Sequence, residues 1–194
     1  MASHPRLSLL SSALACSVLV ACAGLSPASP TLSPAYRCVP EAGGDPVPCG
    51  PIEFEQAQAR DALYAEAEAV YRRFWTRVGA ALRFRIACSV SLEIEATTAG
   101  SFLKYVEAEF AAPSYARRVA GNARLVRLAR YVGGSHSGFT VSLNACWDSS
   151  GVTFSPRGGG PETTGGAVDE NVFLSRLDGV LKLVEAESET VRQC

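Results

Sequence analysis

The stretch FTVSLNACWD, residues 139–148, alternates apolar and polar side chains along its whole length. A period of two is typical of a β-strand, in which successive side chains point to opposite faces of a sheet. The apolar set consists of Phe139, Val141, Leu143, Ala145 and Trp147. The polar set consists of Thr140, Ser142, Asn144, Cys146 and Asp148. We therefore expect a strand here with one apolar face.

The segments on either side of this strand indicate a larger sheet. Downstream, GVTFSP at 151–156 continues the pattern, and a loop rich in Gly, Pro and Thr follows at 157–167. Two more strands are expected around LDG, residues 177–179, because Asp-Gly is a strong signal for a two-residue hairpin turn. Upstream, ARLVRLARYV at 123–132 fits either a strand or a short basic helix, and GGSHSG at 133–138 predicts a flexible turn.

The N-terminal half of the folded part predicts helices. Apolar residues recur at steps of three and four from Glu55 to Arg83, which indicates a long amphipathic helix. A second helix is expected at 98–111, after a capping threonine. The segment 84–95 alternates but lies between two helical stretches, so it predicts a short strand or a loop. Helices followed by an antiparallel sheet make the expected fold class α+β.

The first 21 residues predict a signal peptide. Residues 7–21 carry no charge and are too few to span a bilayer comfortably, but suit a signal-peptide core. They end in LVAC, residues 19–22, which resembles the lipobox of bacterial lipoproteins. In that family the cysteine, here Cys22, receives a lipid, and cleavage occurs just before it. The alternatives are an ordinary signal peptide with a chance cysteine, and an uncleaved anchor.

A lipid on Cys22 would place the mature protein on the extracytoplasmic face of the cell membrane. Two acyl chains hold a protein there stably, whereas one chain holds it only marginally. The sequence then divides into a signal peptide at 1–21, a Pro- and Ser-rich tether with a small disulfide loop at 22–53, and one domain at 54–194.

Composition and motifs exclude several functions. The net charge is −1, which gives no signal for nucleic acid. Only His136 would survive processing, and no C-x-x-C occurs, so we expect no metal site. GSHSG at 134–138 has His136 where a nucleophile elbow needs serine, and no phosphate-binding glycine motif is present. The sequence therefore predicts no cofactor and no convincing catalytic set.

Seven cysteines are present, and an oxidising compartment favours pairing. Cys38 and Cys49 flank a turn-rich loop that can close on itself. Cys146 and Cys194 can pair if their strands are neighbours, which would make the C-terminal cysteine a staple. Cys88 lies in an apolar context and is either a buried inert thiol or a reactive one.

Two further groups of residues have a structural and a functional interpretation. The aromatic side chains on the helical stripes are either plain core or the lining of a ligand pocket, for which we select Tyr71, Trp75 and Phe102. The arginines of 117–130 are either a solvated surface or a basic face for anionic lipids and wall polyanions. That face would consist of Arg117, Arg118, Arg124, Arg127 and Arg130.

Several segments carry a family resemblance. They are the lipobox, the helix at 61–75, the strand end ACWDSSGVTF at 145–154 and the final segment at 173–194. With these, the chain resembles the nuclear transport factor two-like (SnoaL-like, ketosteroid-isomerase-like) cone fold, and more closely a group of secreted lipoproteins of high-GC Gram-positive bacteria. In that group the corresponding cysteines pair, which implies a disulfide between Cys146 and Cys194.

The resemblance also implies a curved sheet around a cavity, and a dimer formed through the sheet. Enzymes of this fold place an Asp or His acid or base in the cavity, and the candidates here are Asp148, Asp169, Glu170 and His136. Asp148 is also expected to hydrogen-bond its own turn. The leading expectation is a non-catalytic module that binds a small apolar ligand or a protein partner. The alternatives are a lyase or isomerase acting in the cone, and a structural envelope component.

Overall fold

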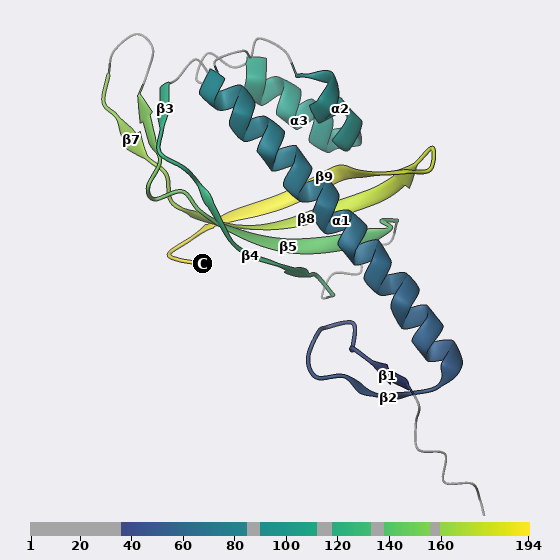
Figure 1. Cartoon of the computed structure of the whole chain (residues 1–194). Helices are drawn as coiled ribbons and strands as arrows, with labels where there is room; N and C mark the ends of the chain where they lie inside the picture. The colour runs from purple at the N-terminus through teal and green to yellow at the C-terminus, as the bar shows by residue number, and fades with distance from the viewer. Residues whose placement is uncertain (1–35, 85–89, 112–117, 133–137, 156–159) are drawn as a thin grey trace, which may run out of the picture. The chain divides into compact units, whose positions relative to one another are not determined.

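The computed structural model describes residues 36–84, 90–111, 118–132, 138–155 and 160–194. Helices and antiparallel strands occur together, so the predicted α+β class is confirmed (Figure 1). The helices are α1 (Pro51–Phe84), α2 (Leu92–Thr97) and α3 (Gly100–Ala111). None of the helices in the described part of the chain has the length and apolar character needed to cross a membrane.

The main sheet contains four antiparallel strands in the order β4-β5-β8-β9. They are β4 (Arg124–Arg130), β5 (Val141–Asp148), β8 (Ala167–Leu177) and β9 (Val180–Val191). The β8–β9 hairpin turns at Asp178 and Gly179, both with positive φ, as the Asp-Gly signal predicts. The segment 123–132, which fitted a strand or a helix, forms β4.

Shorter strands form two smaller sheets. One is the hairpin of β1 (Tyr36–Cys38) and β2 (Val47–Cys49). The other has the order β3-β6-β7, made of β3 (Arg118–Ala120), β6 (Thr153–Ser155) and β7 (Thr163–Thr164).

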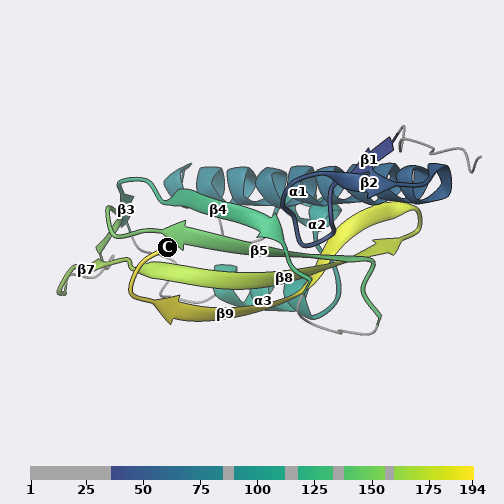
Figure 2. The ribbon, with the colours of Figure 1, turned by 90° about the horizontal axis from the view of Figure 1, so that it is seen from below.

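The helices cover one face of the main sheet, and seen from below, the strands lie in front of α1 and α3 (Figure 2). We call the helix-covered face the inner face and the opposite one the outer face. The inner face of β5 presents Val141, Leu143 and Ala145, all buried, as the alternating pattern predicts. Phe139 departs from the prediction, because it precedes the strand and stacks on Phe173 of the outer face at 4.9 Å.

The long helix begins at Pro51, four residues earlier than expected. Proline suits the first helical position, where its missing N–H is not needed. Gly50 precedes it and donates its N–H to the Glu53 carboxylate at 2.8 Å, which is one half of a capping box. The β1–β2 hairpin packs beside this first part of α1, with the rings of Tyr36 and Phe54 4.9 Å apart.

The segment 84–95 was expected to be a strand or a loop, and this is wrong for its last four residues, because residues 92–97 form α2. Ser91 caps this helix by accepting a hydrogen bond from the N–H of Ile94, whose side chain is fully buried. Thr98 closes α2 and forms a bridge with Leu183 of β9, so α3 begins only at Gly100. Cys88 lies outside the described residues.

Candidate functional site

A buried acid lies on the inner face of the sheet, against the long helix. Glu170 of β8 accepts a hydrogen bond from the hydroxyl of Tyr71 of α1 at 2.7 Å. The same hydroxyl accepts a hydrogen bond from the indole N–H of Trp147 of β5 at 2.6 Å. These three side chains form a continuous hydrogen-bonded chain, which we call the acid relay. Tyr71 is completely buried and Glu170 is 8% exposed.

The strand register explains why Glu170 faces inward. Glu170 is opposite Ala145 in the β5–β8 pair, and Ala145 belongs to the apolar face of β5. Asp169, its neighbour in sequence, is opposite Cys146 and therefore belongs to the outer face. The carboxyl groups of two residues adjacent in sequence thus lie on opposite faces of the sheet.

Burial controls the charge of the acid relay. Removal from water raises the pKa of Glu170, and the hydrogen bond from Tyr71 opposes this rise only in part. The pKa of Tyr71 is also raised, first by burial and then by the negative charge of Glu170, so its hydroxyl stays protonated. Glu170 also contributes to a raised pKa at Tyr105 of α3, behind burial and Glu109. The acid is therefore close enough to influence α3 electrostatically.

Aromatic rings surround the acid relay. The ring centroids of Trp75 and Trp147 are 5.0 Å apart, and each lies 6.3 Å from that of Tyr71. The indole N–H of Trp75 lowers the pKa of Tyr71 but forms no hydrogen bond of good geometry among the described residues. Phe74 joins Phe102 of α3 to this group, at 5.2 Å.

The three residues selected as a candidate pocket are therefore brought together. Tyr71 and Phe102 are buried in the core, and Trp75 packs against it partly exposed. Their packing supports the core interpretation, while the acid relay adds chemistry that the aromatic pattern alone did not indicate. A separate groove of about 380 Å³ lies between the β1–β2 hairpin and α1, lined by residues such as Val39, Pro48 and Ala57, and contains no group of the relay.

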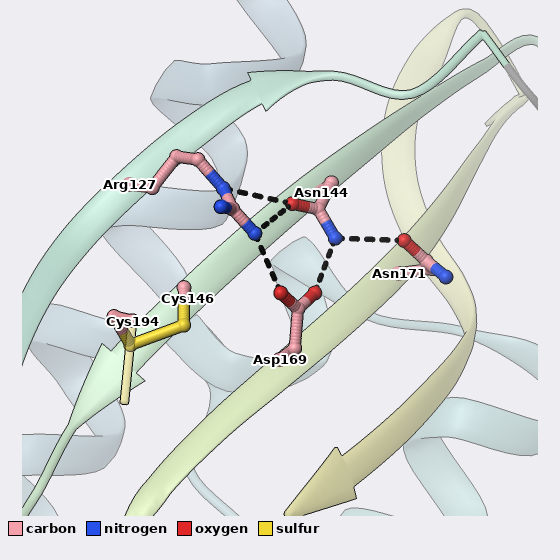
Figure 3. Close-up of polar contacts among 6 residues, drawn as sticks. All are labelled: Arg127, Asn144, Cys146, Asp169, Asn171 and Cys194. Atoms are coloured by element: carbon pink, nitrogen blue, oxygen red, sulfur yellow. Dashed lines mark hydrogen bonds and ion pairs between the residues drawn. A yellow bond between two sulfur atoms is a disulfide. The ribbon is translucent and has the colours of Figure 1, made fainter. Parts of the chain in front are cut away.

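The outer face carries a second polar cluster, which we call the outer network (Figure 3). Arg127 of β4 donates through Nε and Nη2 to the Oδ1 of Asn144 at 3.1 and 2.9 Å, and it forms an ion pair with Asp169. Asn144 of β5 donates to Asp169 and, at 2.9 Å, to Asn171 of β8. Three strands therefore contribute to one network that is open to solvent.

The predicted basic face is not formed by the described arginines. Arg127 is neutralised by Asp169, and the exposed Arg124 lies 3.4 Å from Asp148. Arg130 lies on the opposite face of the sheet, where it pairs with Asp61 of α1 at 2.9 Å and stacks on Tyr64 at 4.6 Å. Arg127 and Arg130 are three residues apart, so the alternation of a strand places them on opposite faces, while the shift in register between Leu125 and Arg127 puts Arg124 on the same face as Arg127. Arg117 and the Arg118 side chain lie outside what the structure describes.

Both predicted disulfides are present, Cys38–Cys49 and Cys146–Cys194. Cys146 and Cys194 were expected to pair if their strands were neighbours, but β5 and β9 are not adjacent in the sheet. β8 lies between them, so the chain after Val191 crosses β8 to reach Cys146 (Figure 2). The disulfide lies on the same face of the sheet as the outer network (Figure 3). Lipidation of Cys22 falls outside the described residues.

The remaining acid and base candidates have local roles or lie outside the structure. Asp148 accepts hydrogen bonds from the N–H and the hydroxyl of Ser150, as its turn predicts, and these bonds lower its pKa. Asp169 belongs to the outer network, and His136 is not among the described residues. Within the described part of the chain, no group of His, Cys, Asp and Glu is arranged to hold a metal ion.

Comparisons with protein-family models, curated proteins and solved structures find no match for this chain. Function is therefore inferred from the geometry of the acid relay and of the outer network.

Proposed function

We propose that this protein is a lipoprotein anchored through Cys22 on the extracytoplasmic face of the cell membrane, where its α+β unit binds a small apolar ligand. The LVAC motif supports the anchor. The two disulfides support an extracytoplasmic location, because such bonds persist in oxidising surroundings and are rare in the cytosol.

The arrangement of helices and sheet supports a cone-like, SnoaL-like module. The described helices lie on one face of the main sheet, and α3 packs against the long strand β9. The β8–β9 pair is irregular between Phe173 and Leu174. Such irregularities increase bending and twist, as a sheet curved around a cavity requires.

The observation that carries the binding function is the acid relay. A carboxyl group in an apolar interior costs stability unless it is neutral and hydrogen-bonded. Glu170 accepts a hydrogen bond from Tyr71, and its burial raises its pKa and so favours the neutral form. Aromatic side chains surround it, and those of Trp75 and Trp147 are partly exposed. An apolar surface with a few fixed polar groups is the usual composition of a small-ligand site. A neutral Glu170 would donate a hydrogen bond to a ketone or hydroxyl oxygen.

The test uses prodan, a fluorescent naphthyl ketone that absorbs tryptophan emission. Trp75 and Trp147 are the two tryptophans of the chain, and both flank Tyr71, so energy transfer reports prodan bound to this domain, and the loss of binding in a Glu170 variant locates the site. We expect saturable transfer with the full-length protein and at least about tenfold weaker binding in Glu170→Leu. Asn171→Ala, on the outer face of the same strand, is the matched control and should bind normally. Absence of saturable transfer would reject this ligand class.

A second candidate function, a lyase or isomerase, is favoured by the raised pKa of Glu170 and its bond to Tyr71. An acid whose pKa is raised by burial keeps its proton to a higher pH than an exposed carboxyl group, which suits it to donate that proton to a substrate. The discriminating measurement is deuterium uptake in D2O at the carbon next to the prodan carbonyl. Uptake that Glu170→Gln abolishes would support the enzyme. Binding without uptake would support the binding module alone.

The anchor is tested separately by the mass of the protein extracted from its membrane. We expect a chain that begins at Cys22 and carries lipid, and a Cys22→Ser variant that no longer partitions into detergent. A Cys22→Ser variant that stays with the membrane would reject the anchor while leaving the binding site untouched.

A further inference from the structure

We propose that the outer network, together with the aromatic side chains beside it, binds a neutral oligosaccharide. This site is on the face of the sheet opposite the acid relay, so it is independent of the function proposed above. Three features of the site favour such a ligand: its unused hydrogen-bonding groups, its charge and the neighbouring rings.

The central residue of the network, Asn144, has all of its hydrogen-bonding groups occupied, whereas the residues around it keep free ones. Asn144 uses both of its amide hydrogens, toward Asp169 and Asn171, and its oxygen accepts twice from Arg127. Asn144 therefore has no capacity left for a ligand and instead fixes its three neighbours. Those neighbours keep free groups within the described structure, namely the Nη1 donors of Arg127, the Nδ2 donors of Asn171 and remaining lone pairs on Asp169.

The free groups include both donors and acceptors and come from β4 and β8, the strands on either side of β5 (Figure 3). A sugar hydroxyl is itself both donor and acceptor, so neighbouring hydroxyls can give hydrogen to Asp169 and accept it from Arg127 or Asn171. Arg127 is about half exposed and Asp169 about a quarter, at 49% and 24%, so a ligand can reach both.

Charge favours a neutral ligand. Arg127 and Asp169 form an ion pair, so the network has no net charge. The neighbouring strand β9 adds Glu185, opposite Phe173, and Glu189, opposite Asp169, on the same face. A polyanion would be repelled by these acids.

Aromatic rings lie next to the network on the same face. Phe173 is two residues beyond Asn171 on β8, which places it about 7 Å farther along the strand. It is fully buried beneath two partly exposed rings, Phe139 at 4.9 Å and Tyr131 at 6.3 Å between centroids. Such rings offer an apolar surface for the C–H face of a pyranose, while the network binds its hydroxyls. The spacing suits adjoining sugar units of one chain.

The test is biolayer interferometry of the full-length protein in detergent against immobilised glucan, mannan, galactan and arabinan oligosaccharides, with heparin as the charged contrast. We expect at least one neutral oligosaccharide to bind with little dependence on salt. Asn171→Ala and Tyr131→Ala should each weaken that binding by about tenfold or more, the loss expected for about 1.4 kcal/mol. Tyr131→Phe should bind normally, because it keeps the ring.

Glu170→Gln is the matched control, since Glu170 is next to Asn171 but on the inner face. It should leave oligosaccharide binding unchanged, and thermal unfolding of each variant checks that the fold is intact. The proposal is overturned if none of the four neutral oligosaccharides binds, if only heparin binds, or if folded Asn171→Ala binds as tightly as the unchanged protein.

Discussion

Tyr71 and Glu170 are 99 residues apart in the chain, yet a hydrogen bond of 2.7 Å joins them inside the core. The bond connects α1 with β8, and Trp147 extends it to β5. A buried polar network stabilises a fold only while every member keeps its partner. The acid relay is therefore both a candidate binding group and a sensitive point for stability.

Removing the central hydroxyl should be costly. Tyr71→Phe leaves the indole N–H of Trp147 and the carboxyl of Glu170 without their partner, so we expect a loss of about 2 kcal/mol in the free energy of unfolding. Urea unfolding followed by tryptophan fluorescence measures it. Tyr64→Phe is the control, because that hydroxyl has only a long 3.5 Å contact with Glu41. Equal losses in both variants would show that the relay contributes no stability.

The raised pKa of Glu170 predicts a definite pH dependence. The folded protein retains this proton at pH values where the unfolded chain, with an ordinary pKa near 4.5, has lost it. The free energy of unfolding should therefore fall as pH rises from the unfolded to the folded pKa, and stay level outside that window. Glu170→Gln removes this decline, so its advantage over the unchanged protein should grow with pH. Urea midpoints from pH 4 to 8 test this, and an advantage that shrinks with pH would contradict it.

Local patterns in the sequence predicted much of the sheet, because they depend on near neighbours. The alternation around Leu143 gave the inner face of β5, and Asp178-Gly179 gave the hairpin. The helix α2 was missed because a short alternating segment has no period long enough to distinguish strand from helix. Its formation depends on the Ser91 cap and on the burial of Ile94.

The acid relay and the outer network depend on the register between strands, which local sequence patterns do not reveal. Asp169 and Glu170 have similar chemistry, and only the pairing with β5 decides which one is buried. A one-residue shift exchanges the two faces of a strand. The irregularity after Leu125 has this effect on β4, where it places Arg124 and Arg130, six residues apart, on opposite faces.

The two disulfides should differ in their contribution to stability. In the chain-entropy model, a cross-link that closes a longer loop restricts the unfolded chain more. The separations are 48 residues for Cys146–Cys194 and 11 for Cys38–Cys49. We expect a loss of about 4 kcal/mol for Cys146→Ala with Cys194→Ser, against about 3 kcal/mol for Cys38→Ser with Cys49→Ser. Denaturant unfolding of both double variants provides the comparison, and the reverse order would show that loop length does not govern these bonds.

A final prediction concerns the close approach of two turns, one between β3 and β4 and the other between β5 and β6. Gly121 has a φ of +87°, and a Cβ on it would lie 2.0 Å from the carbonyl oxygen of Gly151. Gly44 also has a positive φ, +108°, but a Cβ there would meet no atom within 4 Å. Gly44→Ala therefore isolates the backbone strain, expected at about 1 kcal/mol, whereas Gly121→Ala adds a backbone clash and should lose several times more.

Thermal unfolding of Gly121→Ala and Gly44→Ala measures the difference directly. Because β3 pairs with β6 and β4 pairs with β5, the contact of Gly121 with Gly151 lies where the small sheet and the main sheet meet. A large loss confined to Gly121→Ala would mean that the two sheets depend on this contact. Similar midpoints for the two variants would mean that the turns separate at little cost, and that the small sheet forms independently of the main one.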